Sequence, residues 1–324
     1  MMIDVFNDIE GLTTITNSNY DFTKSKIIFA VDLDHLGFEI ELLNFLKELQ
    51  SDAFDKSDAI ILINTPNQFH SKSFAQTLIF TLNQLGCQFV GRPIVESIKD
   101  LKNLVTPAKA HNCTLTEALL KQCVDLKDRF LNFYFEPKKN PKLLVLHSSN
   151  KATSNTLRFW QMVERHLEWD VKEIHIENNE IKDCNGCPFT TCSYFGETNS
   201  CIFKGKIIDE VFPSILECDG LILLTPNYND SLGAQLTAFI NRLSSLFRHN
   251  DFYDKTLFSV IVSGYSGSDC LAKQMISSLA INKQFRLPPK FCLSEIANEK
   301  DAILKISDIE AKAEAFAKQI SENI

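Results

Sequence analysis

The stretch "CDGLILLTPNYNDSLGAQLTAFINRL" (218–243) is the clearest structural signal in this chain of 324 residues. After its aspartate, the run "GLILLT" is apolar throughout, as a strand buried on both faces of a sheet should be. Beyond a polar loop, the helical positions i, i+3, i+4, i+7 and i+11 carry Leu236, Phe239, Ile240, Leu243 and Phe247. A buried strand, a polar loop and an amphipathic helix together predict one unit of an α/β sheet.

The same alternation continues on both sides of this stretch. Further strands are predicted at 142–147, 171–176 and 257–264, and further helices at 155–167, 268–282 and 301–322. Strands that alternate with helices predict a parallel sheet covered on both faces. The second half is therefore expected to be a doubly wound α/β domain.

The first half resembles the second. The segment "SDAIILINTPNQFHSKSFAQTLIFTLNQL" (57–85) also runs from aspartate through an apolar strand, Thr-Pro-Asn and a polar loop to Ala-Gln and a helix. An earlier strand at 26–31 runs into Asp32 and Asp34, where an anion-binding loop would need Ser, Thr or Gly. We predict a duplicated fold whose N-terminal copy is degenerate and binds no cofactor. The alternative is the general likeness of any two α/β units.

The segment "FEPKKNPKL" (135–143) predicts an interdomain linker, because it has two prolines, a charge run and no apolar periodicity. The expected domains are 1–137 and 141–324. Apolar residues make up 44% of the chain and charged residues 23%, which is typical of a soluble globular protein. The acidic start and the absence of an apolar run of about 20 residues predict a cytoplasmic protein without a membrane span. A net charge of −8 argues against nucleic-acid and membrane partners.

Ligands of an open parallel sheet bind outside the carboxyl ends of its strands. The loop "HSSNKATSNT" (147–156) lies there and leads into a helix N-terminus, where the helix dipole favours an anion. Its side-chain donors include Ser148, Asn150, Ser154, Asn155 and Thr156. The loop therefore predicts a phosphate site, and the alternative is an ordinary helix cap in a polar turn.

Two more loops follow strands at the same edge. In "TPNYNDS" (225–231), Pro226 stiffens the turn, Asn227 and Asn229 can bond a heterocycle, and Tyr228 can pack on an aromatic ring. In "SGYSGSD" (263–269), Ser263 precedes Gly264, which allows close backbone approach, and Tyr265 offers another flat surface. One loop for a phosphate and two for a planar ring indicate a flavin mononucleotide (FMN) site.

The segment from 143 to about 270 resembles the NADPH-dependent FMN reductase family of the flavodoxin-like superfold. The matching features are the Ser-rich loop ending in "SNT", the C-x-G-C segment, the strand "CDGLILLTPNY" and "AQLTAFINR". The resemblance implies noncovalent FMN, which takes a hydride from NAD(P)H and passes electrons to a quinone, a flavin or another small acceptor. It also implies that the first loop holds the phosphate and that the other two border the ring. The sequence departs from the family where His147-Ser148-Ser149-Asn150 replaces Gly-Ser-x-Arg, and where "KGK" (204–206) replaces an acidic pair.

Four of the ten cysteines lie within "DCNGCPFTTCSYFGETNSC" (183–201). Cys184, Cys187, Cys192 and Cys201 have the spacing C-x2-C-x4-C-x8-C, which is similar to the cysteine segment of iron-sulfur flavoproteins but stretched. Four thiolates suit a [4Fe-4S] cluster or a zinc ion. The remaining alternative is that they are reduced thiols in a loop that caps the flavin.

The leading hypothesis is thus an FMN-dependent NAD(P)H oxidoreductase with a small-molecule electron acceptor, and it is compatible with a homodimer. An iron-sulfur flavoprotein that carries electrons is one alternative. A flavodoxin-like binding module without enzymatic activity is the other. The chemistry belongs to the flavin in the leading hypothesis, so no catalytic side chain is predicted.

Overall fold

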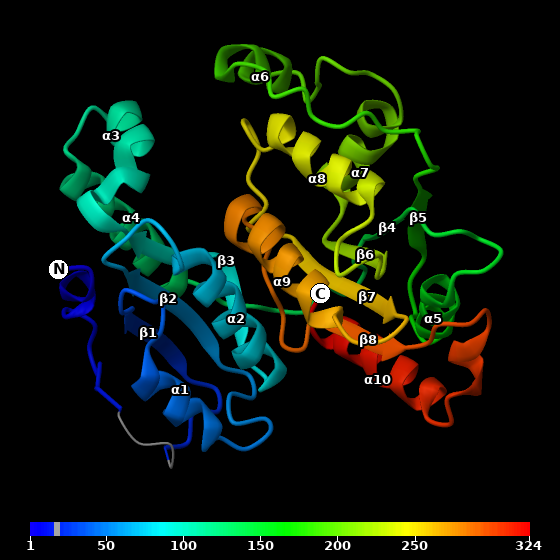
Figure 1. Ribbon diagram of the computed structural model, residues 1–324, viewed down its shortest axis with the longest axis horizontal. Helices are drawn as coiled ribbons and strands as arrows, with labels where there is room; N and C mark the ends of the chain where they lie inside the picture. Colours follow the sequence, from blue (N-terminus) through cyan, green and yellow to red (C-terminus); the bar gives the residue numbers. More distant parts are fainter. Residues whose placement is uncertain (16–19) are drawn as a thin grey trace. The chain divides into compact units, whose positions relative to one another are not determined.

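The computed structural model describes residues 1–15 and 20–324. The chain divides into two compact units, Met1–Tyr134 and Phe135–Ile324. Each unit contains its own parallel β-sheet with helices on its faces (Figure 1). The predicted α/β class is therefore confirmed.

The sheet of the second unit has five parallel strands in the order β5-β4-β6-β7-β8. They are β4 (Leu143–His147), β5 (Val171–His175), β6 (Gly220–Pro226), β7 (Thr256–Ser263) and β8 (Cys292–Ile296). Numbered along the unit, this order is 2-1-3-4-5, the order of flavodoxin-like folds. The edge strand β8 was not predicted from the sequence, because its residues are half-buried or exposed and carry no continuous apolar run.

The two central strands explain why this sheet needs cover on both faces. All eight residues of β7 are buried, as are the first six of the seven in β6. Helices α5 (Asn155–Glu164) and α10 (Ile309–Glu322) pack on one face, where Trp160, Phe258 and Phe316 share a core. The opposite face is covered by α8 (Ala234–Leu246) and α9 (Ser268–Met275), which continues as the π-helical turn η4 (Ile276–Ile281) (Figure 1).

The connection between β5 and β6 holds the cysteine segment. It contains α6 (Phe189–Gly196), the π-helical turn η3 (Ile207–Val211) and α7 (Phe212–Glu217). A short 3-10 helix, η5 (Ala302–Lys305), precedes α10.

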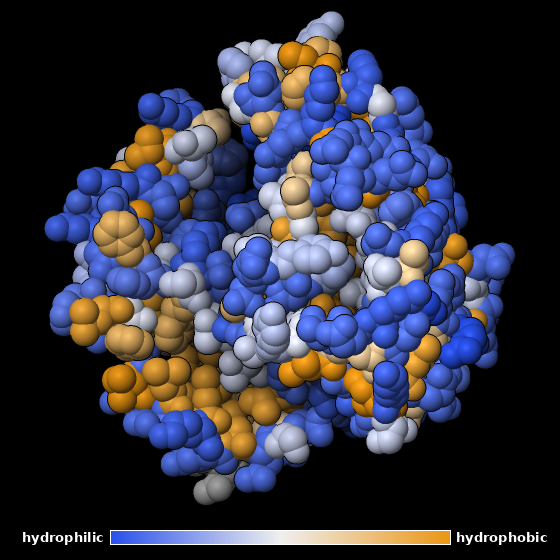
Figure 2. Space-filling view, turned by 45° about the vertical axis from the view of Figure 1, so that its right-hand side comes forward, coloured by the Kyte–Doolittle hydropathy of each residue, from blue (hydrophilic) through white to orange (hydrophobic). Residues whose placement is uncertain are grey.

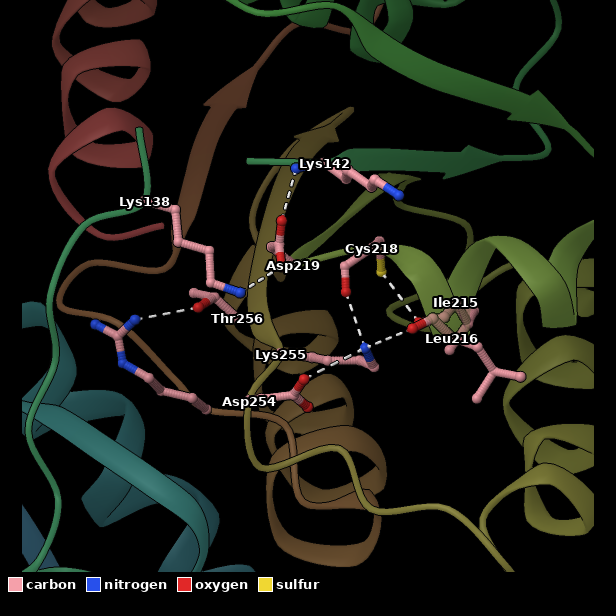
Figure 3. Close-up of polar contacts among 10 residues, drawn as sticks. Lys138, Lys142, Ile215, Leu216, Cys218, Asp219, Asp254, Lys255 and Thr256 are labelled. Atoms are coloured by element: carbon pink, nitrogen blue, oxygen red, sulfur yellow. Dashed lines mark hydrogen bonds and ion pairs between the residues drawn. The ribbon is translucent and has the colours of Figure 1, made fainter. Parts of the chain in front are cut away.

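The amino-terminal edge of this sheet is closed by the protein's own polar groups (Figure 3). The Asp219 carboxylate pairs with Lys138 and accepts a hydrogen bond from the Lys142 amide at 2.7 Å. Burial opposes ionisation of Asp219, but these two partners outweigh it and lower its pKa. The buried Lys255 ammonium donates to the carbonyls of Leu216 at 3.1 Å and Cys218 at 2.9 Å, at the C-terminal end of α7. A ligand site is therefore expected at the opposite, carboxyl edge.

The sheet of the first unit has three parallel strands in the order β1-β2-β3. The strands are β1 (Lys26–Asp32), β2 (Asp58–Asn64) and β3 (Gln88–Ser97). The helices are η1 (Ile3–Phe6), α1 (Ile40–Lys47), α2 (Ser71–Gln84), η2 (Lys99–Leu104), α3 (Val105–His111) and α4 (Leu115–Leu131). Matching β1, β2 and β3 to β4, β6 and β7 leaves β5 and β8 without counterparts in the described part of this unit. Two parallel sheets related in this way are consistent with a duplicated arrangement.

The loop after β1 gives a physical reason for the predicted degeneracy of the first unit. Asp34 Oδ1 accepts hydrogen bonds from the amides of Leu36 at 2.8 Å and Phe38 at 3.0 Å. The hydrogen bond from Phe38 is the largest cause of the lowered pKa of Asp34. A carboxylate of the chain thus already binds the amides that a phosphate would need.

Apolar side chains also reach the surface of the first unit. Leu36, Phe38 and Ile40 are each at least half exposed, and α1 has no fully buried residue. Figure 2 shows apolar side chains gathered at the lower left of that view. Within the described residues, no helix is long and apolar enough to cross a bilayer.

The shared core of α5, β7 and α10 predicts the effect of one truncation. Phe258 is fully buried and meets the Phe316 ring edge-on, with 6.2 Å between centroids. We expect Phe258→Ala to lower the free energy of unfolding of the second unit by about 3–5 kcal/mol, because a cavity remains. Both tryptophans, Trp160 and Trp169, lie in this unit, so urea unfolding followed by tryptophan fluorescence measures the change.

Leu304→Ala is the control for this truncation. Leu304 is half exposed, so its removal should change the free energy of unfolding by less than about 0.5–1 kcal/mol. Equal losses in the two variants would contradict the described core.

Candidate functional site

The three predicted ligand loops meet at the carboxyl edge of β4, β6 and β7. A Cβ placed on Gly233 would lie 3.6 Å from Ser148 Oγ and 3.9 Å from Tyr228 Cδ2. The first loop therefore adjoins the second. A Cβ placed on Gly267 would lie 1.9 Å from Asp230 Oδ1 and 3.1 Å from Asn227 Nδ2, so the second loop adjoins the third. The structure brings the loops together as one continuous edge.

The first loop runs from His147 to the start of α5. Asn150 Oδ1 accepts a hydrogen bond from the Ala152 amide at 2.9 Å, which forms a tight local turn. Ser154 is the helix N-cap, and its Oγ accepts from the Leu157 amide at 3.2 Å. The predicted helix start is therefore present, and it turns the first amides of α5 toward the loop.

The predicted phosphate residues differ in how accessible they are. Ser148 and Ser154 are half-buried, Asn150 is exposed, and Thr156 is buried. Asn155 is also buried, and its amide donates to the carbonyls of Ala297 at 3.0 Å and Glu299 at 2.8 Å. The Asn155 side chain thus anchors the segment after β8, a role that the sequence pattern did not reveal.

The donor set of this loop fits a phosphate group. The Ser149 hydroxyl is buried and has no hydrogen-bond partner in the part of the chain that the structure describes. Lys151 is exposed and forms no ion pair with any described residue. The loop from 147 to 156 contains no carboxylate, so nothing within it repels an anion. Lys151 offers a positive charge one residue after the position where the family pattern has arginine.

The second loop is braced from within. Asn227 Oδ1 accepts from the Asp230 amide at 2.8 Å, and Asn227 Nδ2 lies 3.1 Å from both Asp230 Oδ1 and Ser263 Oγ. Asn229 and Asp230 have φ values of 55° and 56°, in the left-handed region. The Asn227 side chain therefore joins the loops after β6 and β7, whereas the sequence suggested that it would bond a heterocycle.

The third loop is held by the same contacts. Ser263 is buried, and its hydroxyl lies 2.8 Å from Ser268 Oγ, at the start of α9. A Cβ placed on Gly264 would lie 2.9 Å from Asn298 Oδ1, so the loop passes close to the Asn298 side chain. The sequence patterns did not indicate that Asp230, Gly267 and Ser268 help to hold these loops together. Only the doubled glycine pattern of "SGYSGSD" pointed to a close backbone approach there.

Two aromatic rings remain exposed on these loops. Tyr228 is 56% exposed and Tyr265 is 78% exposed, while Pro226 is half-buried at the end of β6. Exposed aromatic rings at a ligand edge suit a planar heterocycle, which can stack on them. The edge thus offers phosphate donors on one loop and flat apolar surface on the other two.

Two cavities of the molecule lie elsewhere and contain none of the predicted site residues. One of about 550 Å³ lies in the first unit, around the junction of α3 and α4. The other, of about 540 Å³, lies beside the amino-terminal ends of β4 and β5. The two exposed tyrosines at the carboxyl edge of the second unit line neither cavity.

The cysteine segment packs along α8. Asp183 Oδ1 accepts from the Cys184 amide at 2.6 Å and from Asn241 Nδ2 at 2.9 Å. Farther on, a Cβ placed on Gly196 would lie 2.5 Å from the Ser245 carbonyl oxygen, so α6 contacts the C-terminal part of α8. Ser245 lies 11 residues beyond the start of α8, which is about 16 Å along the helix. α6 thus lies at the far end of α8, whereas Asp183 lies beside the middle of that helix, and a flavin-capping role of the segment stays a prediction.

The structure does not gather the four cysteines of this segment. Cys184 and Cys187 precede α6, Cys192 lies within it and Cys201 follows it, and all four are free thiols. Across residues 1–15 and 20–324, no group of three or more His, Cys, Asp or Glu side chains could hold a metal ion. The [4Fe-4S] and zinc alternatives therefore gain no support from this arrangement and stay predictions.

The strand order and the three loops define a flavodoxin-like domain with an edge suited to FMN. Residues 141–298 match the sequence model of the NADPH-dependent FMN reductase family. The second unit therefore contains a domain of the NADPH-dependent FMN reductase family.

Solved structures with similar folds are distant. NAD(P)H:quinone oxidoreductase from Methanothermobacter marburgensis has a TM-score of 0.42 and 12% identity, over 56% of this chain and 99% of that one. The Trp repressor binding protein of Bacillus subtilis has a TM-score of 0.37 and 18% identity, over 53% of this chain and 97% of that one. No curated protein sequence matches this chain.

The contact between Gly267 and Asp230 predicts a strong effect of one methyl group. Gly267 has a φ of +98°, so Gly267→Ala adds backbone strain as well as a clash with Asp230. Gly205→Ala is a matched control, because Gly205 has a φ of +92° but nothing within 4 Å of its Cβ position. We expect Gly267→Ala to lower the free energy of unfolding by about 1–3 kcal/mol more than the control does. Equal losses in urea unfolding would show that the Asp230 side chain moves aside without cost and does not hold the two loops together.

The exposure of the cysteines predicts their reactivity. Burial raises the pKa of the Cys218 thiol to about 12, whereas Cys184 is exposed. In native protein at pH 8, a thiol reagent should modify Cys184 well before Cys218, which should react only on unfolding. Peptide mapping by mass spectrometry measures the order. If Cys184, Cys187, Cys192 and Cys201 were instead protected in anaerobic protein and released by a chelator, a metal site would be indicated.

Proposed function

We propose that the protein is an FMN-dependent NAD(P)H oxidoreductase that delivers electrons to a small acceptor such as a quinone or a free flavin. The observation that carries this proposal is the meeting of a carboxylate-free phosphate loop with two tyrosine-bearing loops at one edge of a flavodoxin-like sheet. The match of residues 141–298 to the FMN reductase family supports it.

Each loop has a distinct role in this proposal. Lys151, the hydroxyls of Ser148 and Ser149 and the amides at the start of α5 would bind the phosphate of FMN through charge and hydrogen bonds. Tyr228 and Tyr265 would border the flavin ring. Bound FMN would supply the redox chemistry, taking a hydride from NAD(P)H and passing electrons to the acceptor. Asn227 and Ser263 would act indirectly, by holding the two ring loops in register.

The first unit has a different role in this proposal. The amides after β1 are bonded to Asp34, so we propose that this unit binds no flavin and acts as a scaffold. One FMN per chain of 324 residues is the stoichiometry that follows. A cytoplasmic location, a homodimer and independence of nucleic acid and membranes belong to the same proposal.

The proposal predicts how FMN binding responds to one lysine. Lys151→Gln should weaken FMN binding about fivefold, because it removes a cation near the phosphate, and added salt should reduce this difference. Lys172→Gln is the control, since Lys172 is an exposed residue near the amino-terminal end of β5, away from the carboxyl ends where the three loops lie. Quenching of FMN fluorescence measures both affinities.

Activity and stoichiometry complete the test. Purified protein should bind one FMN per chain and then consume NADH or NADPH with a quinone acceptor. Protein that stays colourless after incubation with FMN would reject the proposal. Two FMN per chain would reject the scaffold role of the first unit alone.

A further inference from the structure

His147 ends β4 immediately before the phosphate loop, and its side chain is completely buried. Its Nδ1 accepts a hydrogen bond from the Ser149 amide at 3.2 Å. Its Nε2 lies 3.3 Å from Glu173 Oε1, on the neighbouring strand β5. A ring nitrogen that accepts from an amide carries no proton, so in the neutral imidazole Nε2 carries the proton and donates it to Glu173.

Burial and two neighbouring groups favour this neutral form. The His175 ring stacks on it with 4.8 Å between centroids, and the ammonium of Lys151 lies on the loop side. Burial is the largest cause of its lowered pKa, and Glu173 opposes that effect while His175 and Lys151 add to it. Glu164 of α5 interacts with Glu173 and, through burial, has a raised pKa. His147 is therefore neutral at pH 7 and able to accept.

We propose that His147 is a positioning residue for the phosphate loop. Held through Nε2 by Glu173, its neutral imidazole fixes the Ser149 amide through Nδ1 and so sets the shape of the loop. This rests on the proposed function, because the ligand that the loop positions would be the phosphate of FMN. This hydrogen bond gives a reason for the histidine at a position where the family pattern has glycine.

The reason is the cost of a buried amide without a partner. Ser149 is fully buried, so without Nδ1 its amide would lose its hydrogen bond where water cannot replace it. The loop would then have to rearrange beside Ser148 and Lys151, the residues nearest the proposed phosphate. A protonated His147 has the same effect as removal of the acceptor, because both of its ring nitrogens are then donors.

Two substitutions separate the effect of the hydrogen bond to the Ser149 amide from the effect of protonating His147. In His147→Asn, the side-chain oxygen can accept from the amide two residues ahead, as Asn150 already does with Ala152 at 2.9 Å. This variant keeps the acceptor but does not titrate. His147→Leu removes the acceptor at every pH.

FMN dissociation constants should distinguish the three proteins. At pH 7.5, we expect the Asn variant to bind FMN within about twofold of wild type and the Leu variant to bind about tenfold more weakly. Below the pKa of His147, wild type should approach the Leu variant. The Asn variant should show only the change due to the phosphate of FMN itself, whose second pKa is about 6. Identical pH profiles for wild type and the Asn variant would overturn the proposal, as would full affinity in the Leu variant.

A second measurement uses the protein without FMN and so separates this inference from the proposed function. The ¹⁵N chemical shifts of the His147 ring should show an unprotonated Nδ1 and a protonated Nε2, with a His175→Gln variant used for assignment. The Ser149 amide signal should titrate with the same pKa as the ring. The opposite tautomer would overturn the inference even if FMN binds. Failure of wild type to bind FMN would reject the proposed function, while the NMR result would still decide the role of His147 in the loop.

Thermal unfolding is the folding control for these variants. If His147→Leu does not fold, the comparison of wild type with His147→Asn across pH and the tautomer measurement carry the test.

Discussion

The burial of β7 and of the first six residues of β6 is the constraint on which the second unit depends. These buried residues are mostly apolar on both faces of the sheet, so helices must cover both faces. The few polar side chains inside the sheet bond to the strands themselves, as Ser259 does to the Leu223 carbonyl at 2.8 Å, so a ligand is expected at one of the two ends of the strands. At the amino-terminal edge, Asp219 and Lys255 are bonded to the chain itself. At the carboxyl edge, the Ser149 hydroxyl and the Lys151 ammonium have no hydrogen-bond or ion-pair partner among the described residues, which is why the candidate site lies there.

The carboxyl edge is held together by bonds between loops rather than by its strands. Asn227 links the loop after β6 to Ser263, and Gly267 admits the Asp230 carboxylate. His147 adds a similar bond within the phosphate loop, through the Ser149 amide. Several polar residues of the edge thus position others, and the groups left for a ligand are the tyrosine rings, Lys151 and the helix amides. In the first unit, by contrast, the Asp34 carboxylate accepts hydrogen bonds from the amides of the loop after β1.

Much of this could be predicted from residue patterns. The apolar strand of 220–225, the amphipathic helix after it and the start of α5 at Ser154 all follow from local periodicity and capping chemistry. The edge strand β8 could not, because its half-exposed residues lack an apolar run. Nor could the position of α6, since its eight residues carry no signal of which part of α8 they contact.

The sequence by itself determined the α/β class, the alternation of strands and helices that predicts a parallel sheet, and the three loops that follow strands. It could do so because a strand buried on both faces needs a continuous apolar run, which is visible in the local sequence. The folded chain alone determined which polar side chains remain free for a ligand. Asn155, Asn227 and Ser263 read as ligand donors in the sequence, yet each bonds to a segment at least 30 residues away. Hydrogen-bond partners brought together from distant strands leave no local pattern, so residue type and spacing could not assign these roles.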